Sequence, residues 1–175
     1  MLKQILIRTG LLLLLVLIYF GIWRDVRGLL TVYAVIPQVE FAATHCNEYI
    51  FLTERSNTSL IIQVFEERIN DYRDFSYTAP AGFYLLFGLA ALILIGAKKV
   101  HYYLLAGFHA LLWAVVLLVI LPGLCFHLLF LNIIDLSIKY LTPFGTFVII
   151  IMAITPGFME KLSSGSKNGS EPERE

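Results

Sequence analysis

A long apolar run close to the start of the chain, Ile5 to Trp23, constrains the fold more than any other feature of the sequence. A helix of this length, rising ~1.5 Å per residue, reaches about 28 Å, which is enough to cross the hydrocarbon core of a bilayer. Bulky residues such as Tyr19 and Phe20 close the run, where a cleaved signal peptide would carry small residues. We therefore predict an uncleaved membrane anchor.

The composition also indicates a membrane protein. Hydrophobic residues make up 58% of the chain and charged residues 15%, with a mean hydropathy of +0.78, whereas a soluble domain carries about a quarter charged residues. The 13 basic residues balance the 13 acidic ones, so no overall positive field is available to hold nucleic acid. A chain of 175 residues also leaves no room for a separate soluble catalytic domain.

Apolar runs in the second half predict further spans. Pro80 to Ala97 makes a second span, and Tyr102 to Leu121 makes a third that ends at the helix-breaking pair Pro122-Gly123. Leu124 to Leu141 is long enough to cross but contains polar residues, and Phe144 to Phe158 is apolar but short. We favour an interfacial position for the polar segment. The predicted fold class is an all-α polytopic membrane protein with four, alternatively five, transmembrane helices.

The orientation follows from the positive charges between the second and third spans. Lys98 and Lys99 sit near both membrane ends, which places this gap in the cytoplasm. By parity the N-terminus is then cytoplasmic. The C-terminal tail is rich in serine, glycine and charge and should be disordered. The expected organisation is an anchor at 1–23, an extracytoplasmic segment at 24–78, a membrane bundle at 79–159 and the tail at 160–175.

The extracytoplasmic segment is predicted to begin with helices. Apolar residues at helical spacing, from Val26 to Ile36, place one apolar face on a helix that continues from the first span and is interrupted by Pro37. Val39 to Phe51 is a second helical candidate. We expect the first of these helices to lie along the membrane surface or to pack on the bundle.

A β-hairpin is predicted after these helices. Branched and aromatic residues concentrate in Ser59 to Phe65 and again in Tyr72 to Tyr77, with a turn near Asn70-Asp71. Residues two apart share a strand face, so one face should pack on the chain and the other should be available to a partner. Which face does which is open at this point. The candidate contact residues are Ile61 and Phe65 on one face and Ile62 and Val64 on the other.

Candidate nucleophiles and metal ligands are few. Cys46 has three interpretations: a small buried residue, one half of a disulfide with Cys125, or a reactive thiol. His45 is adjacent to Cys46, but neighbouring helical residues point about 100° apart, which places it badly as a base. The spacing of histidines and cysteines is not typical of a zinc site, so we expect no metal and no cofactor.

Polar residues within the apolar stretches form a second group of candidates. His109 falls near the middle of the third span, where it either bonds a nearby group or takes part in proton transfer. Asn132, Asp135 and Lys139 follow one side of the fourth segment. This side faces water if the segment is interfacial, and a partner or cavity if it spans.

The layout resembles that of a known family. One N-terminal span, a surface helix, a short β segment and then Tyr77-Thr78-Ala79-Pro80-Ala81-Gly82 leading into further spans is similar to small accessory membrane proteins associated with bacterial exosortases. This resemblance implies the bacterial inner membrane and a partner in an envelope sorting or polysaccharide-export system. Exosortases themselves use a cysteine, an arginine and a histidine, and Cys46, Arg55 and His127 supply these residue types. The chain has too few spans, and no recognisable motif around these residues, to carry that role over.

The function expected from the sequence is therefore a non-enzymatic integral membrane accessory subunit. It would lie in the lipid bilayer and contact a membrane protein partner through its extracytoplasmic segment. Two other classes remain open: a membrane-embedded thiol transpeptidase or protease built on Cys46, and a small transport component that uses His109 and Asp135.

Overall fold

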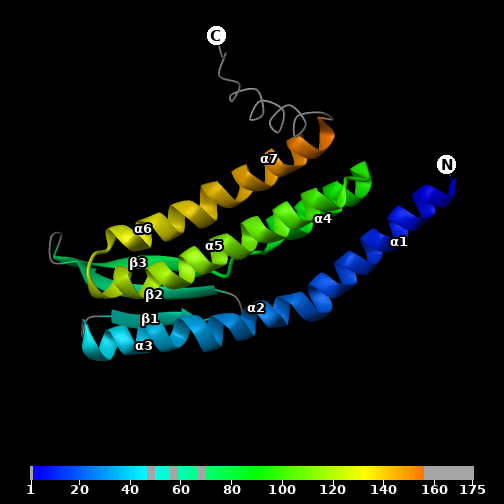
Figure 1. The fold of residues 1–175 in the computed structure, drawn as a ribbon. Coiled ribbons are helices and arrows are strands. Elements are labelled where there is room, and N and C mark those ends of the chain that lie inside the picture. The colour runs from blue at the N-terminus through cyan, green and yellow to red at the C-terminus, as the bar shows by residue number, and fades with distance from the viewer. Residues whose placement is uncertain (1, 47–49, 56–58, 67–69, 156–175) are drawn as a thin grey trace, which may run out of the picture.

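A computed structural model describes residues 2–46, 50–55, 59–66 and 70–155 of the chain (Figure 1). The predicted tail, residues 160–175, lies outside this described part. A long N-terminal helix leads to a small antiparallel sheet. The later helices lie alongside the N-terminal helix. The N-terminal end of the first helix lies at one end of the molecule, and the sheet lies at the other (Figure 1).

The N-terminal helix is continuous from Leu2 to His45, a length of 44 residues. At ~1.5 Å per residue it reaches about 66 Å, more than twice the thickness of a bilayer core. Its apolar first part agrees with the predicted anchor, and the helix passes residue 23 without a break. Its parts are α1 (Leu2–Ile18), a π-helical turn (Tyr19–Trp23), α2 (Arg24–Leu30), a second π-helical turn (Thr31–Val35) and α3 (Ile36–His45).

The predicted interruption at Pro37 is wrong. The π-helical turn before it adds one residue to the helix, and the N–H of Ile36 donates to the carbonyl of Thr31, five residues back. Pro37 then occupies the first turn of α3, where its missing N–H costs little. The helix therefore accommodates the proline instead of ending at it.

The sheet has three antiparallel strands in the order β1-β2-β3, namely β1 (Ile50–Arg55), β2 (Ser59–Glu66) and β3 (Asp71–Thr78). The predicted hairpin corresponds to β2 and β3, in which Ile62 pairs with Phe75. Asn70, with a φ of 52°, supplies the left-handed residue before β3. The predicted helix from Val39 to Phe51 is correct as far as His45, where α3 ends, and wrong at Ile50 and Phe51, which belong to β1 and pair with β2.

The second half of the chain forms two helices that lie antiparallel to each other, followed by a third helix that is antiparallel to the second. α4 (Phe83–Ile95) ends at Gly96 in the left-handed conformation, and α5 (Lys99–Cys125) follows directly. Pro122 lies inside the last turns of α5, so the predicted break at Pro122-Gly123 comes too early. The break lies at Phe126 to Leu128, after which α6 (Leu129–Leu136) begins.

The two predicted segments at 124–141 and 144–158 are also wrong as separate units. α6, a π-helical turn (Ser137–Leu141) and α7 (Thr142–Ile154) form one continuous helix of 26 residues. As at Pro37, a π-helical turn precedes the proline: the N–H of Thr142 donates to the carbonyl of Ser137, and Pro143 starts α7. This single helix replaces both the interfacial segment and the pair of spans that the sequence suggested.

The described part of the chain is mostly helical, and three of its helices are long and apolar enough to cross a membrane. They are Leu2–His45, Lys99–Cys125 and Leu129–Ile154. α4 is apolar but has 13 residues. It packs tightly, since a Cβ on Gly88 would lie 2.8 Å from Leu105 and 3.0 Å from Thr146. We call α1, α4, the first half of α5 and α7 the stem.

A separate core lies under the sheet. α3, the second half of α5 and α6 form a helical layer, and the sheet covers it, with β1 next to α3 and β3 next to α6 (Figure 1). We call this two-layer unit the sheet module. The stem has its own small core around Leu92, Leu105 and Ile149. The buried core of the sheet module consists of Val35, Ile36, Val39, Ala42, Ile50, Leu60, Ile62, Val64, Tyr77, Ala79, Val116, Ile120, Leu124, Leu131 and Ile134.

Candidate functional site

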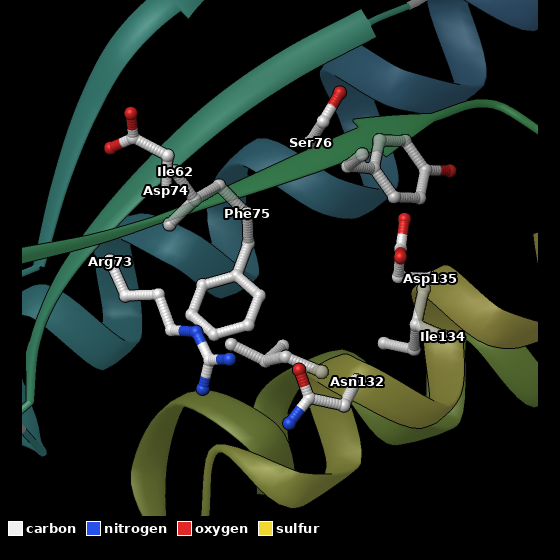
Figure 2. Close-up of a pocket in the computed structure, with 10 residues that line it drawn as sticks. Ile62, Arg73, Asp74, Phe75, Ser76, Asn132, Ile134 and Asp135 are labelled. Carbon is white, nitrogen blue, oxygen red and sulfur yellow. The ribbon is translucent and has the colours of Figure 1, made fainter.

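A groove of about 280 Å³ separates β3 from α6 at the edge of the sheet module (Figure 2). We call it the β3–α6 groove. One wall consists of the five consecutive β3 residues from Arg73 to Tyr77, and Ile62 lies behind them on β2. The other wall is α6, which contributes Leu131, Asn132, Ile134 and Asp135.

The strand register explains which β3 side chains enter this groove. Arg73, Phe75 and Tyr77 pair with three buried residues of β2, and directly opposed residues share a face of the sheet. These three side chains therefore point toward the helical layer. Asp74 points to the other face, where its Oδ1 accepts a hydrogen bond of 2.9 Å from Nε2 of Gln63.

Charges of opposite sign lie at the two ends of the groove. The Arg73 side chain extends toward α6 near Asn132, whereas Asp135 lies at the far end (Figure 2). The Arg73 guanidinium carbon is 5.8 Å from the centre of the Phe75 ring, within the range of a cation–π contact. The groove thus combines a cation, a carboxylate, an amide and an aromatic ring.

The structure therefore brings together two of the polar residues expected from the sequence. Asn132 and Asp135 are exposed on α6 and line the groove. Lys139 lies beyond it in the π-helical turn, with its ammonium nitrogen 5.5 Å from the centre of the Tyr140 ring. His109 does not line the groove; it is buried in the stem, where its Nε2 lies 3.3 Å from Oγ1 of Thr146. The hydroxyl of Thr146 also donates to the carbonyl of Thr142, so His109 has a local polar partner.

A second polar cluster joins the stem to the sheet module, and the sequence analysis missed it. Trp23 and Arg27 lie one turn apart on the N-terminal helix and hold the loop before α4 by its carbonyls. Nε1 of Trp23 donates to Ala81 at 2.8 Å, Nε of Arg27 donates to Pro80 at 3.0 Å, and Nη2 of Arg27 donates to Ala79. We call this set the Trp23–Arg27 clamp.

The clamp determines two further features of the loop. Ala81 adopts a φ of 55°, which is unusual for a residue with a side chain. A Cβ on Gly82 would lie 2.8 Å from Nη2 of Arg27, so a larger residue at this position would displace the guanidinium from its place in the clamp. The clamp could have been found from its spacing, because Tyr19, Trp23, Arg27 and Thr31 recur every four residues.

Tyr77 connects the clamp to the groove. It lines the groove from β3 and interacts with Arg27 and Thr31 on the N-terminal helix. Burial raises the pKa of Tyr77 to about 12, against the opposing effects of the Arg27 charge and the Thr31 hydrogen bond. The phenol is therefore neutral at physiological pH and acts as a hydrogen-bonding group.

The cysteines decide between the three interpretations of Cys46. Cys46 and Cys125 form a disulfide that joins the end of α3 to the end of α5. The interpretations as a small buried residue and as a reactive thiol are therefore wrong for this oxidised state. Of the other residues considered for catalysis, His127 is exposed and its Nδ1 accepts the N–H of Leu129 at 3.0 Å. Only the backbone of Arg55 is described, in β1.

Loss of this disulfide should destabilise the sheet module. It closes a loop of 79 residues, and a bridge of this kind contributes about 2 to 4 kcal/mol to the free energy of unfolding. The denaturant concentration at the midpoint of unfolding should therefore be lower for Cys46→Ala, for Cys125→Ala and for reduced wild type than for oxidised wild type. The decrease should be similar in the three cases. Dithiothreitol should not change the unfolding midpoint of the double variant Cys46→Ala/Cys125→Ala, which has no disulfide to reduce. An unchanged midpoint for fully reduced wild type would contradict a stabilising role.

The structure also distinguishes the two faces of β2. Ile62 and Val64 are buried against the helical layer, together with Leu60. Ile61 and Phe65 lie on the opposite face and are half-buried, with the Phe65 ring against Tyr72. The face that packs on the chain is thus that of Ile62 and Val64.

Comparisons with known proteins do not extend this description. The sequence matches no family model, no curated protein and no solved structure. Among the described residues, no group of three or more histidine, cysteine, aspartate or glutamate side chains is arranged to hold a metal ion. The geometry of the β3–α6 groove is therefore the basis for its proposed role.

Proposed function

We propose that this chain is a non-enzymatic integral membrane accessory subunit that contacts a protein partner through its extracytoplasmic segment. The observation that supports this proposal best is the sheet module itself. It has its own core, it is fastened to the stem by the Trp23–Arg27 clamp, and it carries an open polar groove at its edge. A rigid module of this kind is suited to presenting a binding surface at a fixed height above a membrane.

The proposed orientation uses four crossings: the N-terminal helix, α4, α5 and the helix from Leu129 to Ile154. Lys98, in the turn between α4 and α5, and Lys99, the first residue of α5, face the cytoplasm. The N-terminal end of α1, this turn and the C-terminal end of α7 lie together at the end of the molecule opposite the sheet (Figure 1). Both ends of the described chain are then cytoplasmic and the sheet module is extracytoplasmic.

The cellular setting that we propose follows from the family resemblance of the layout. It is the bacterial inner membrane, with a partner in an exosortase-type envelope sorting or polysaccharide-export system. The Thr-Ala-Pro-Ala-Gly entry that carries the local part of this resemblance, from Thr78 to Gly82, is the loop that Trp23 and Arg27 hold.

The two other function classes have less support. A thiol transpeptidase or protease needs a free sulfur on Cys46, and the disulfide occupies that atom. A proton-linked transport component needs an ionisable partner close to His109, and the recorded partner is the hydroxyl of Thr146.

A labelling experiment tests the orientation. Because the native cysteines are joined in a disulfide, single cysteines can be added to the otherwise unchanged chain. Asp71→Cys and Lys98→Cys introduce exposed positions at opposite ends of the molecule. An impermeant maleimide applied to intact cells should label the first variant, and it should label the second only after lysis. Labelling of both from outside would overturn the proposed topology.

Purification from native membranes tests the role as a subunit. The full chain, extracted in mild detergent, should run as a complex whose native mass exceeds that of the chain in its micelle, with one membrane protein in fixed ratio. The Lys3→Ala variant, altered at an exposed position of α1, should give the same complex. A chain that elutes alone from native membranes under these conditions would contradict the proposal.

A further inference from the structure

We propose that the β3–α6 groove binds an extended segment of a polypeptide partner, which adds to β3 as a fourth strand. This inference rests on the proposed function and specifies the kind of partner surface involved. The segment carries an acidic side chain that meets Arg73 and a basic side chain that meets Asp135. Three features of the groove support it: the strand edge, the charged ends and the polar walls.

The strand edge is the first feature. In the described part of the sheet, β3 pairs with β2 on one side and has no strand on the other. About half of the N–H and C=O groups of an edge strand point away from its neighbour and are available to another chain. Side chains alternate between faces, so a hollow on one face of a strand meets every second residue. Five consecutive residues line this groove, which means that it follows the edge itself.

The charged ends are the second feature. The five residues from Arg73 to Tyr77 cover about 13 Å at ~3.3 Å per residue. An added strand of about five residues fills this length. Arg73 and Asp135 lie at opposite ends (Figure 2), and both complementary side chains of the added strand must be on the face that meets the groove, so they are about four residues apart. The order of the acidic and the basic residue along the segment then determines the direction in which it lies.

The polar walls are the third feature. Asn132 lies between the two charged residues along the groove (Figure 2), while Phe75 and Ile134 supply apolar contact. A lipid chain in this groove would cover the Asn132 amide and the Asp135 carboxylate without forming hydrogen bonds to them, at a cost for each group removed from water. A peptide backbone offers donors and acceptors along its whole length. The groove is therefore better suited to a polypeptide than to a hydrocarbon chain.

Selection from a random peptide library tests this inference without knowledge of the natural partner. A phage-displayed decapeptide library is selected against the full-length protein in detergent, and the enriched peptide is synthesised. We expect a peptide with one acidic and one basic residue four positions apart. Because strand addition uses the backbone, N-methylation of alternate amides in this peptide should weaken binding at least tenfold.

Charge reversal on the protein provides the matched control. Asp135→Arg should weaken binding of the selected peptide about tenfold or more. A peptide in which the basic residue is replaced by glutamate should bind this variant better than wild type. Glu40→Arg makes the same change at an exposed position of α3, outside the groove, and should leave the affinity within twofold. Thermal unfolding of both variants verifies that the fold is retained.

Two results would overturn the inference. One is a selected peptide that tolerates N-methylation and binds Asp135→Arg as well as wild type. The other is the absence of any enriched peptide while the protein binds vesicles of anionic lipid, with tighter binding of these vesicles by Asp135→Arg and unchanged binding by Glu40→Arg. Either result leaves the subunit proposal standing if the native complex persists. A chain that elutes alone from native membranes but binds the selected peptide as described would contradict the subunit proposal. It would leave standing the inference that the groove binds an extended polypeptide.

Discussion

Replacing Arg27 with alanine should lower the free energy of unfolding of the detergent-solubilised protein by about 3 to 5 kcal/mol. The Arg27 side chain is 7% exposed, and its guanidinium donates to the carbonyls of Ala79 and Pro80. Both bonds have a charged donor, and both acceptors lose their partner in the variant. Unfolding by denaturant, followed by tryptophan fluorescence, is a direct measurement, because the Trp23 indole bonds the same loop.

Two further substitutions distinguish the loss of the clamp's hydrogen bonds from the general effect of removing a positive charge. Arg24→Ala removes an exposed arginine three residues earlier on the same helix and should cost less than about 0.5 kcal/mol. Arg27→Lys keeps the charge but loses the planar fork that reaches two carbonyls, so it should recover only part of the stability. If Arg27→Ala unfolds at the same denaturant concentration as Arg24→Ala, the clamp does not hold the sheet module to the stem.

The elements that local sequence patterns predicted correctly are those with strong local preferences. Alternating branched and aromatic residues predicted β2 and β3, and Asn70 marked the turn before β3. The errors lie at prolines. Pro37 was expected to interrupt a helix, and the segments 124–141 and 144–158 were expected to be separate, but a π-helical turn before Pro37 and before Pro143 supplies an extra residue and the helix continues. The sequence alone does not reveal such turns.

Hydropathy also could not divide the stem from the sheet module. α5 is apolar along its whole length, yet Leu105 belongs to the stem core while Val116 and Ile120 support the sheet. A buried helix and a membrane span use the same residues, so the boundary depends on what packs against each part. The strand from Ile50 to Arg55 was missed for a related reason, since it is stabilised by pairing with β2, a non-local contact.

The candidate site was only partly predictable for the same physical reason. Asn132 and Asp135 are conspicuous because they interrupt an apolar segment, so the sequence analysis selected them. Arg73 lies in a polar stretch of the chain and has no such contrast. Only the strand register, which puts Arg73 opposite the buried Val64, turns it toward α6. A groove between a strand and a distant helix therefore becomes visible only in the folded chain.

Aspartate at Ile62 should reduce the amount of folded protein far more than aspartate at Ile61. Ile62 is 2% exposed in the core between the sheet and the helical layer, so the substitution buries a charge and removes apolar contacts. A loss of at least about 4 kcal/mol is expected, which is a large part of the stability of a small domain. Ile61 is half-buried on the opposite face, where a carboxylate keeps access to water.

The measurement compares the two variants in the same membrane preparation by quantitative immunoblot and by the midpoint of unfolding in denaturant. Ile62→Asp should be less abundant than wild type and should unfold at a lower denaturant concentration. The free energy of unfolding of Ile61→Asp should stay within about 1 kcal/mol of that of wild type. Binding of the peptide selected for the β3–α6 groove extends the comparison, because Ile62 also lies behind that groove and Ile61 does not line it. Ile61→Asp should therefore bind the peptide normally. Equal abundance of the two variants would mean that the sheet does not pack on α3, α5 and α6 through the face that carries Ile62.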